Sequence, residues 1–143
     1  MAITQGMATS FKVQLLNGQQ NFSANTFKLA LYTSAATLGE GTTAYTTSGE
    51  VASTGNYTAG GNTLTVNVTP TSSGNVAYVS FANTSWANAT ITANGALIYN
   101  SSQSNSAVAV LAFGGDKTST NGTFAVNFPT ADASSAIIRL TAS

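Results

Sequence analysis

The 143-residue sequence contains no cysteine and no histidine. Without cysteine, the chain can form neither a disulfide framework nor a thiolate metal site. Without histidine, a serine or cysteine nucleophile lacks its usual general base, and a metal ion lacks its commonest nitrogen ligand. The sequence therefore predicts a protein that is not an enzyme, with no catalytic residue, no cofactor and no metal site.

Charged side chains are also scarce. Four Lys or Arg balance four Asp or Glu, so the net charge is zero and 6% of the chain is charged, against about 25% in ordinary domains. Nucleic-acid binding depends on clustered Lys and Arg that neutralise phosphates, and four dispersed cations form no basic stripe. We expect no nucleic-acid partner. The surface must instead owe its solubility to Asn, Gln, Ser and Thr, which leave little long-range repulsion between neighbours.

Long apolar runs are missing as well. No segment approaches the roughly 18 continuous apolar residues of a membrane span, and the N-terminus shows no charged region followed by an apolar run. We therefore expect no membrane partner and no ordinary export signal.

The few carboxylates also fit catalysis poorly. A glycosidase needs two carboxyl groups held at a fixed separation. Glu40 and Glu50 lie in a loop-like segment, which would not hold such a pair rigidly enough.

The densest apolar part of the chain lies between residues 90 and 116. Residues 97–99 (LIY) and 108–113 (VAVLAF) are rich in aliphatic and aromatic side chains, and seven small polar residues, 100–106, separate them. This arrangement predicts a β-hairpin. Because both segments are apolar at alternate and intervening positions alike, the hairpin should be central and covered on both faces.

Shorter strand patterns surround this hairpin. Half-buried strands are predicted at residues 27–32 and 124–128, and further strands at residues 64–69, 76–81 and 136–141. Pro70 is expected to end the strand at 64–69, residues 72–75 to turn the chain into the strand at 76–81, and Gly114 to Lys117 to form another turn. Seven or eight short strands separated by turn signals are typical of an antiparallel β-sandwich or jelly roll. Trp86 is expected to plug the end of a sheet, with a sugar-stacking platform as the alternative.

Two segments fall outside this pattern. Residues 8–18 predict a short helix capped by Thr9 or Ser10 and ended by Asn17 and Gly18, although the same letters also alternate as a strand would. Residues 1–22 are therefore predicted as an N-terminal arm and residues 23–143 as the sandwich domain. Residues 33–61 predict a long ordered loop with one short edge strand near 44–51, which serves either as a contact surface or as simple packing over the sandwich end.

Several apolar residues precede or interrupt the strand pattern and are predicted to make contacts between molecules. A chain with so few charges does not need all of them for its own sheet. The predicted assembly contacts are Ile3, Met7, Phe11, Leu15, Leu16, Tyr45 and Tyr57.

Five stretches together resemble small structural proteins of tailed bacteriophages and prophages. They are SFKVQLLNGQQNF, FKLALYTSAATLGEGTTAYTTSGEV, GNYTAGG, SWANATITANGALIYNSS and AVAVLAFGGDKTSTNGTFAVNFP, and they cover most of the chain. The stretches are turns and strands, so they indicate kinship without indicating a site. The family carries a histidine in the stretch matching Gln19 to Phe22, and this chain has none there.

The resemblance implies a virion structural protein, such as a head decoration (cement) protein on the outer capsid surface. Its implied partners are the major capsid protein and itself, as a homotrimer, after synthesis in the host bacterial cytoplasm. A tail, baseplate or fibre-associated protein is the alternative within the same class. A carbohydrate-binding adhesin is an alternative from a different class, and it depends on Trp86 and the tyrosines.

Overall fold

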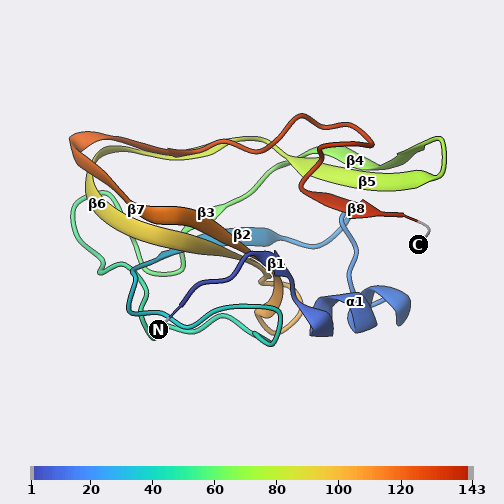
Figure 1. Cartoon of the computed structure of the whole chain (residues 1–143), viewed down its shortest axis with the longest axis horizontal. Coiled ribbons are helices and arrows are strands. Elements are labelled where there is room, and N and C mark those ends of the chain that lie inside the picture. Colours follow the sequence, from blue (N-terminus) through green and yellow to red (C-terminus); the bar gives the residue numbers. More distant parts are fainter. Residues whose placement is uncertain (1, 142–143) are drawn as a thin grey trace.

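The computed structural model describes residues 2–141. Met1, in the predicted arm, and residues 142–143, at the end of the predicted sandwich, lie outside this range. The elements are β1 (Gly6–Met7), α1 (Thr9–Leu16), β2 (Phe27–Tyr32), β3 (Asn62–Thr63), β4 (Val66–Ser73), β5 (Val76–Phe81), β6 (Thr84–Asn100), β7 (Ser106–Val126) and β8 (Ile138–Leu140) (Figure 1). One sheet has the order β1-β7-β6-β2-β3 and the other β4-β5-β8. All of these strand pairs are antiparallel, which confirms the predicted mainly-β, sandwich-like fold with one short helix.

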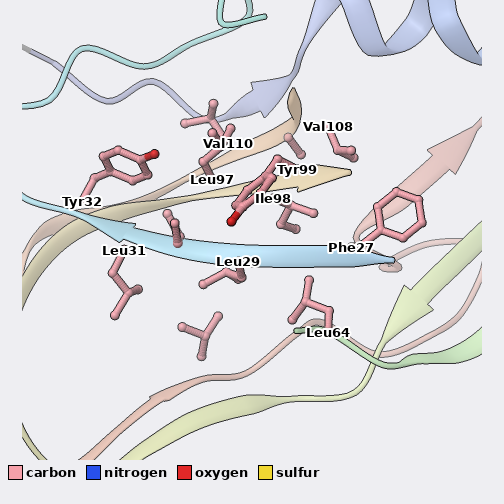
Figure 2. Close-up of a cluster of buried hydrophobic side chains, with 14 of the residues drawn as sticks. Phe27, Leu29, Leu31, Tyr32, Leu64, Leu97, Ile98, Tyr99, Val108 and Val110 are labelled. Atoms are coloured by element: carbon pink, nitrogen blue, oxygen red, sulfur yellow. The ribbon is translucent and has the colours of Figure 1, made fainter. Parts of the chain in front are cut away.

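The predicted central hairpin is formed by β6 and β7. Leu97 pairs with Val110 and Ile98 with Ala109, and Leu97, Ile98 and Val110 are fully buried. Figure 2 shows these side chains packed around β2. Leu111, predicted as a core residue, is only partly buried. The two-sided apolar pattern therefore identified the centre of the sheet correctly, but not the residue at which burial ends.

The β6–β7 hairpin bends back on itself. Ala93 pairs with Lys117 and Gly95 with Ala112, so four residues of β7, 113–116, lie opposite the single residue Asn94. Gly114 and Gly115 have φ angles of 76° and 143°, which most side chains disfavour. Figure 1 shows the paired ribbon reversing direction at this corner and returning above its first part. The predicted turn at Gly114 to Lys117 is thus a corner within one strand rather than the end of a strand.

β2 is more deeply buried than its alternating pattern predicts. Every residue except Lys28 is buried, because β2 lies between β6 and β3 and both of its faces are covered. The hydroxyl of Tyr32 donates to the carbonyl of Thr46, 2.6 Å away, in the long loop over one face. Leu29 and Leu31 point to the other face, toward the second layer (Figure 2). The prediction of a half-buried strand was therefore wrong.

Pro70 lies inside β4 rather than at its end. β4 is an edge strand, paired only with β5, and its register shifts between Val66 and Val68 and between Val68 and Thr71. An edge strand tolerates proline because the missing N–H can face solvent. The predicted stop at Pro70 was wrong, whereas the turn between β4 and β5 is confirmed, with Gly74 at φ 59°.

The N-terminal segment belongs to the core. The helix α1 is confirmed and the strand alternative is excluded, although Ala8 occupies the N-cap position and no side chain caps the helix. Phe11 is fully buried and meets Phe22 edge-on at 6.0 Å between ring centroids. β1 adds to the large sheet beside β7. Residues 2–22 therefore pack as part of the sandwich rather than extending as an arm.

Candidate functional site

Two of the seven predicted assembly contacts are buried within the protomer. Phe11 is 0% exposed and Tyr57 is 1% exposed. The prediction that their side chains form an outer contact surface was wrong, because both fill the space beside the sheet. Tyr45 is partly buried: its ring stacks on Tyr99 with 4.8 Å between centroids, and its hydroxyl donates to Glu50 at 2.6 Å.

Ile3 and Met7 are also engaged by the fold. Both are partly buried and packed against the core. Ile3 forms a β-bridge with Leu38, and Met7 pairs with Ala109 of β7. Gly95 leaves room for Ile3, since an added Cβ would lie 2.8 Å from its side chain. These two residues hold the N-terminal segment on the sheet.

The last turn of α1 presents the clearest exposed apolar surface. Leu16 is 90% exposed and Val13, three residues earlier on the same helix face, is 54% exposed. Leu140 of β8 is 49% exposed, and Figure 1 shows β8 above α1 on the same side of the molecule. Leaving a leucine in water forgoes roughly 1.5–3 kcal/mol of burial free energy. A partner that covered Leu16 would recover this free energy.

A cavity of about 320 Å³ opens between α1 and the small sheet. It is lined by Leu15, Gly18, Gln20, Asn21, Phe22, Pro70, Ala77, Tyr78, Val79, Ile138 and Leu140. No charged residue lines it. We call the surface formed by this cavity together with Val13, Leu16 and Leu140 the α1–β8 surface. Of the predicted contacts, it contains Leu15 and Leu16.

Buried amides fix the chain after α1 against the central hairpin. The Gln20 side chain donates to Gln14 at 2.8 Å and to Ser106 at 3.0 Å. The Asn100 side chain, 0% exposed, donates to Gln20 at 2.8 Å and to Asn25 at 2.9 Å. A buried amide is stable only with such partners. This network was not predicted, because polar residues in turn-like sequence give no signal of burial.

A second polar cluster lies beneath the long loop and centres on Glu50. Its carboxylate accepts hydrogen bonds from the hydroxyls of Tyr45 and Tyr57 and from the backbone N–H of Gly60, at 2.6–2.7 Å. The Tyr57 hydroxyl in turn accepts from the backbone N–H of Leu31 at 2.9 Å. These bonds connect the loop to β2, so the predicted ordered loop is present. Its predicted edge strand is reduced to single bridges at Ala44 and Glu50.

Burial raises the pKa of each tyrosine in this cluster, because the charged phenolate is poorly solvated there. The pKa values of Tyr32, Tyr45 and Tyr57 lie well above the ordinary value. Burial and the nearby charge of Glu50 raise the pKa of Tyr99 to about 12. The hydroxyls therefore remain donors at neutral pH. The cluster holds the loop in place and presents no activated nucleophile.

Trp86 is a core residue, as the first of its two interpretations predicted. Its side chain is 4% exposed, and its ring lies 5.6 Å from Tyr57 and 6.3 Å from Phe124 between centroids. A buried indole cannot stack on a sugar.

Among residues 2–141 there is no group of three or more acidic, His or Cys side chains placed to hold a metal ion. The same part of the chain contains no helix long and apolar enough to cross a membrane. No known protein family, curated protein or solved structure matches this chain.

Proposed function

We propose that the protein is a non-enzymatic structural component of a bacteriophage particle, a decoration protein that binds the major capsid protein on the outer capsid surface. The virion assignment depends on the sequence resemblance. The observation that carries the attachment is the α1–β8 surface, where Leu16 is 90% exposed and the preceding residue, Leu15, lines an uncharged cavity.

The chemistry of this surface suits attachment by many weak contacts. Burial of Val13, Leu16 and Leu140 would supply apolar free energy. Polar residues that line the cavity, such as Asn21 and Tyr78, can form hydrogen bonds without desolvating charges. Each contact is modest, but a particle presents many equivalent sites.

A tail, baseplate or fibre-associated protein is the second candidate, because the same surface could attach there. The carbohydrate-binding alternative loses its main support, since Trp86, Tyr32, Tyr57 and Tyr99 are all buried. Tyr45 and Tyr78 remain only partly exposed, and they provide no flat aromatic platform. We do not propose it further.

The test is quantitative mass spectrometry of purified particles from a host that produces this protein. A decoration protein should be present in hundreds of copies per particle, whereas a tail component should be present in a few to a few dozen. Absence from purified particles would contradict both virion assignments.

The attachment surface is tested separately with Leu16→Ser, which should release the protein from particles. Ala87→Ser changes an exposed alanine on β6 and is the matched control. Equal retention of both variants would exclude the α1–β8 surface as the attachment site.

A further inference from the structure

A larger groove lies on a different part of the molecule. It has a volume of about 540 Å³ and is bordered by both passes of the bent strand β7. Its lining residues are Gln5, Leu111, Ala112, Phe113, Lys117, Thr118, Thr123, Phe124, Ala125, Val126, Asn127, Phe128, Pro129 and Ile137. Apart from Lys117, no lining residue is charged.

The lining pattern shows how the groove is oriented. Successive side chains of a strand point to opposite faces of its sheet, so a groove over one face would be lined by every second residue. This groove is lined by every residue from 123 to 129 and again from 111 to 113. It therefore runs along the edge of β7, where the backbone itself is accessible. An extended strand fits such a groove better than a helix does.

The edge of β7 beside this groove has no strand partner in the described part of the chain. On this side of β7, β1 pairs with Ala109 and Val110, and backbone bonds to Ala8, Thr43 and Ala44 cover residues 106–108. The residues of β7 that line the groove are paired only with β6, on the opposite side. Just beyond β1, the side chain of Gln5 accepts a hydrogen bond from the N–H of Ala112 at 3.2 Å. A side chain thus replaces a neighbouring strand at this point.

The other sheet edges are less open to strand addition. Residues 84–93 of β6 also lack a strand partner on the side away from β7, but the side chains of Asn56 and Asn62 donate there to the carbonyls of Ala87 and Ser85. β1 and β3 have two residues each, β8 has three, and β4 contains Pro70. Short strands and proline are common devices that prevent edge-to-edge pairing. Residues 118–126 of β7 contain neither proline nor charge. Within them, Asn121 has φ 47° and interrupts the ladder. Residues 122–126 of β7 continue without a positive φ, and the remaining register shift, opposite Thr123, lies on β6, where Asn88 has φ 51°.

We infer that this edge pairs with the same edge of a second copy, antiparallel and about a twofold axis. An antiparallel strand pair is self-complementary, because each chain offers the N–H and C=O groups that the other needs. No like charges would meet along residues 118–126. The partly buried side chains of Phe113, Phe128 and Ile137 beside the groove would become covered in both copies. This inference does not depend on the proposed function, since no residue lines both the groove and the cavity of the α1–β8 surface.

The experiment is sedimentation equilibrium of the full-length protein over a wide concentration range. A reversible monomer–dimer equilibrium is expected. Ala125→Lys, at an exposed position of this edge, should weaken dimerisation at least tenfold, because it places like charges close together across the axis. Ala125→Glu should do the same, and an equimolar mixture of the two variants should restore the dimer as a heterodimer. Ala87→Lys, on the neighbouring strand β6, should dimerise normally.

Hydrogen exchange gives a second readout that does not depend on any substitution. Backbone amides of residues 122–126 should exchange more slowly as the protein concentration rises, while those of β4 should not change. A monomer at all concentrations would overturn the inference. So would a trimer, since a twofold contact closes at two copies, or a dimer that Ala125→Lys leaves intact.

Discussion

At the scale of single residues, the least predictable features lie in the loop 33–61. They are the hydrogen bonds that the Glu50 carboxylate accepts and the burial of the Tyr57 side chain. Small polar neighbours surround both residues in the sequence, so no periodicity marks them. Their partners, the N–H groups of Leu31 and Gly60, become adjacent only after the loop folds over β2. Leu97 and Ile98, by contrast, were predictable because a run of apolar residues is buried in almost any packing. The local sequence pattern therefore identified the apolar core, but not the polar contacts that hold the loop against it.

The hydroxyl of Tyr57 should contribute more to the free energy of unfolding than the hydroxyl of the partly exposed Tyr78. Tyr57→Phe is expected to lower the free energy of unfolding by about 1–3 kcal/mol, because it leaves the buried N–H of Leu31 without its acceptor. Tyr78→Phe is the control, since no hydrogen bond of the Tyr78 hydroxyl occurs in the described structure and its loss should cost little. Chemical denaturation of both variants measures the difference. Equal stabilities would mean that water replaces the hydroxyl without cost.

The tyrosine cluster also predicts alkaline instability. In the unfolded chain tyrosine ionises with a pKa of about 10, whereas the pKa of Tyr99 in the fold is about 12 and those of Tyr32, Tyr45 and Tyr57 are also raised. The stabilisation is therefore complete below pH 10 and is lost as the pH rises through the folded-state values. Denaturation measured between pH 8 and 12 should show a fall that begins near pH 10. Tyr99→Phe should make that fall shallower; an unchanged stability up to pH 12 would contradict the argument.

At the scale of elements, the sequence predicted which strands exist more reliably than where they end. The alternation of Val66 and Val68 indicated β4, and the hairpin of β6 and β7 followed from its two apolar segments. The predictions at Gly114, Gly115 and Pro70 were wrong for a common reason. Glycine and proline end strands in many proteins, but glycine also permits a corner within a strand, and proline is tolerated within an edge strand. Only the pairing partner distinguishes these uses, and that partner is distant in the sequence.

The N-terminal segment offers the sharpest test at this scale. Deleting residues 1–16 removes β1 and the fully buried Phe11. Because a buried Phe→Ala change alone costs about 3–5 kcal/mol, the truncated protein should be unfolded or strongly destabilised. Circular dichroism and thermal denaturation measure this outcome. Leu16→Ala is the matched control and should change stability by less than about 0.5 kcal/mol. A folded, assembly-deficient truncation would restore the interpretation of this segment as an arm.

At the scale of the whole molecule, the near absence of charge distinguishes this sandwich from an ordinary domain. Among the described residues there is one ion pair, Lys12 with Glu40 at 3.9 Å, and both side chains are more than half exposed. An exposed pair of this kind contributes little to stability. Folding must therefore depend mainly on apolar burial and on hydrogen bonds rather than on ion pairs.

Attachment to the proposed capsid partner should consequently be insensitive to salt and to moderate pH. Between about 0.05 and 0.5 M NaCl, Debye screening weakens surface ion pairs strongly, yet this protein has few to weaken. Without histidine, no side chain with an ordinary pKa titrates between about pH 5.5 and 8. Sedimentation of decorated particles across these ranges should show nearly constant occupancy. A tenfold or greater release on adding salt would show that ionic contacts carry the binding.

The corner in the β6–β7 hairpin has a mechanical consequence. The same two hydrogen-bonded strands form both passes of this ribbon, with Ala93 and Lys117 on one side of the bend and Gly95 and Ala112 on the other. A force that pulls the layers apart at this end is therefore borne by covalent backbone, not only by side chains meeting across the core. Separation of the two passes should therefore begin away from the corner, where no continuous backbone joins them.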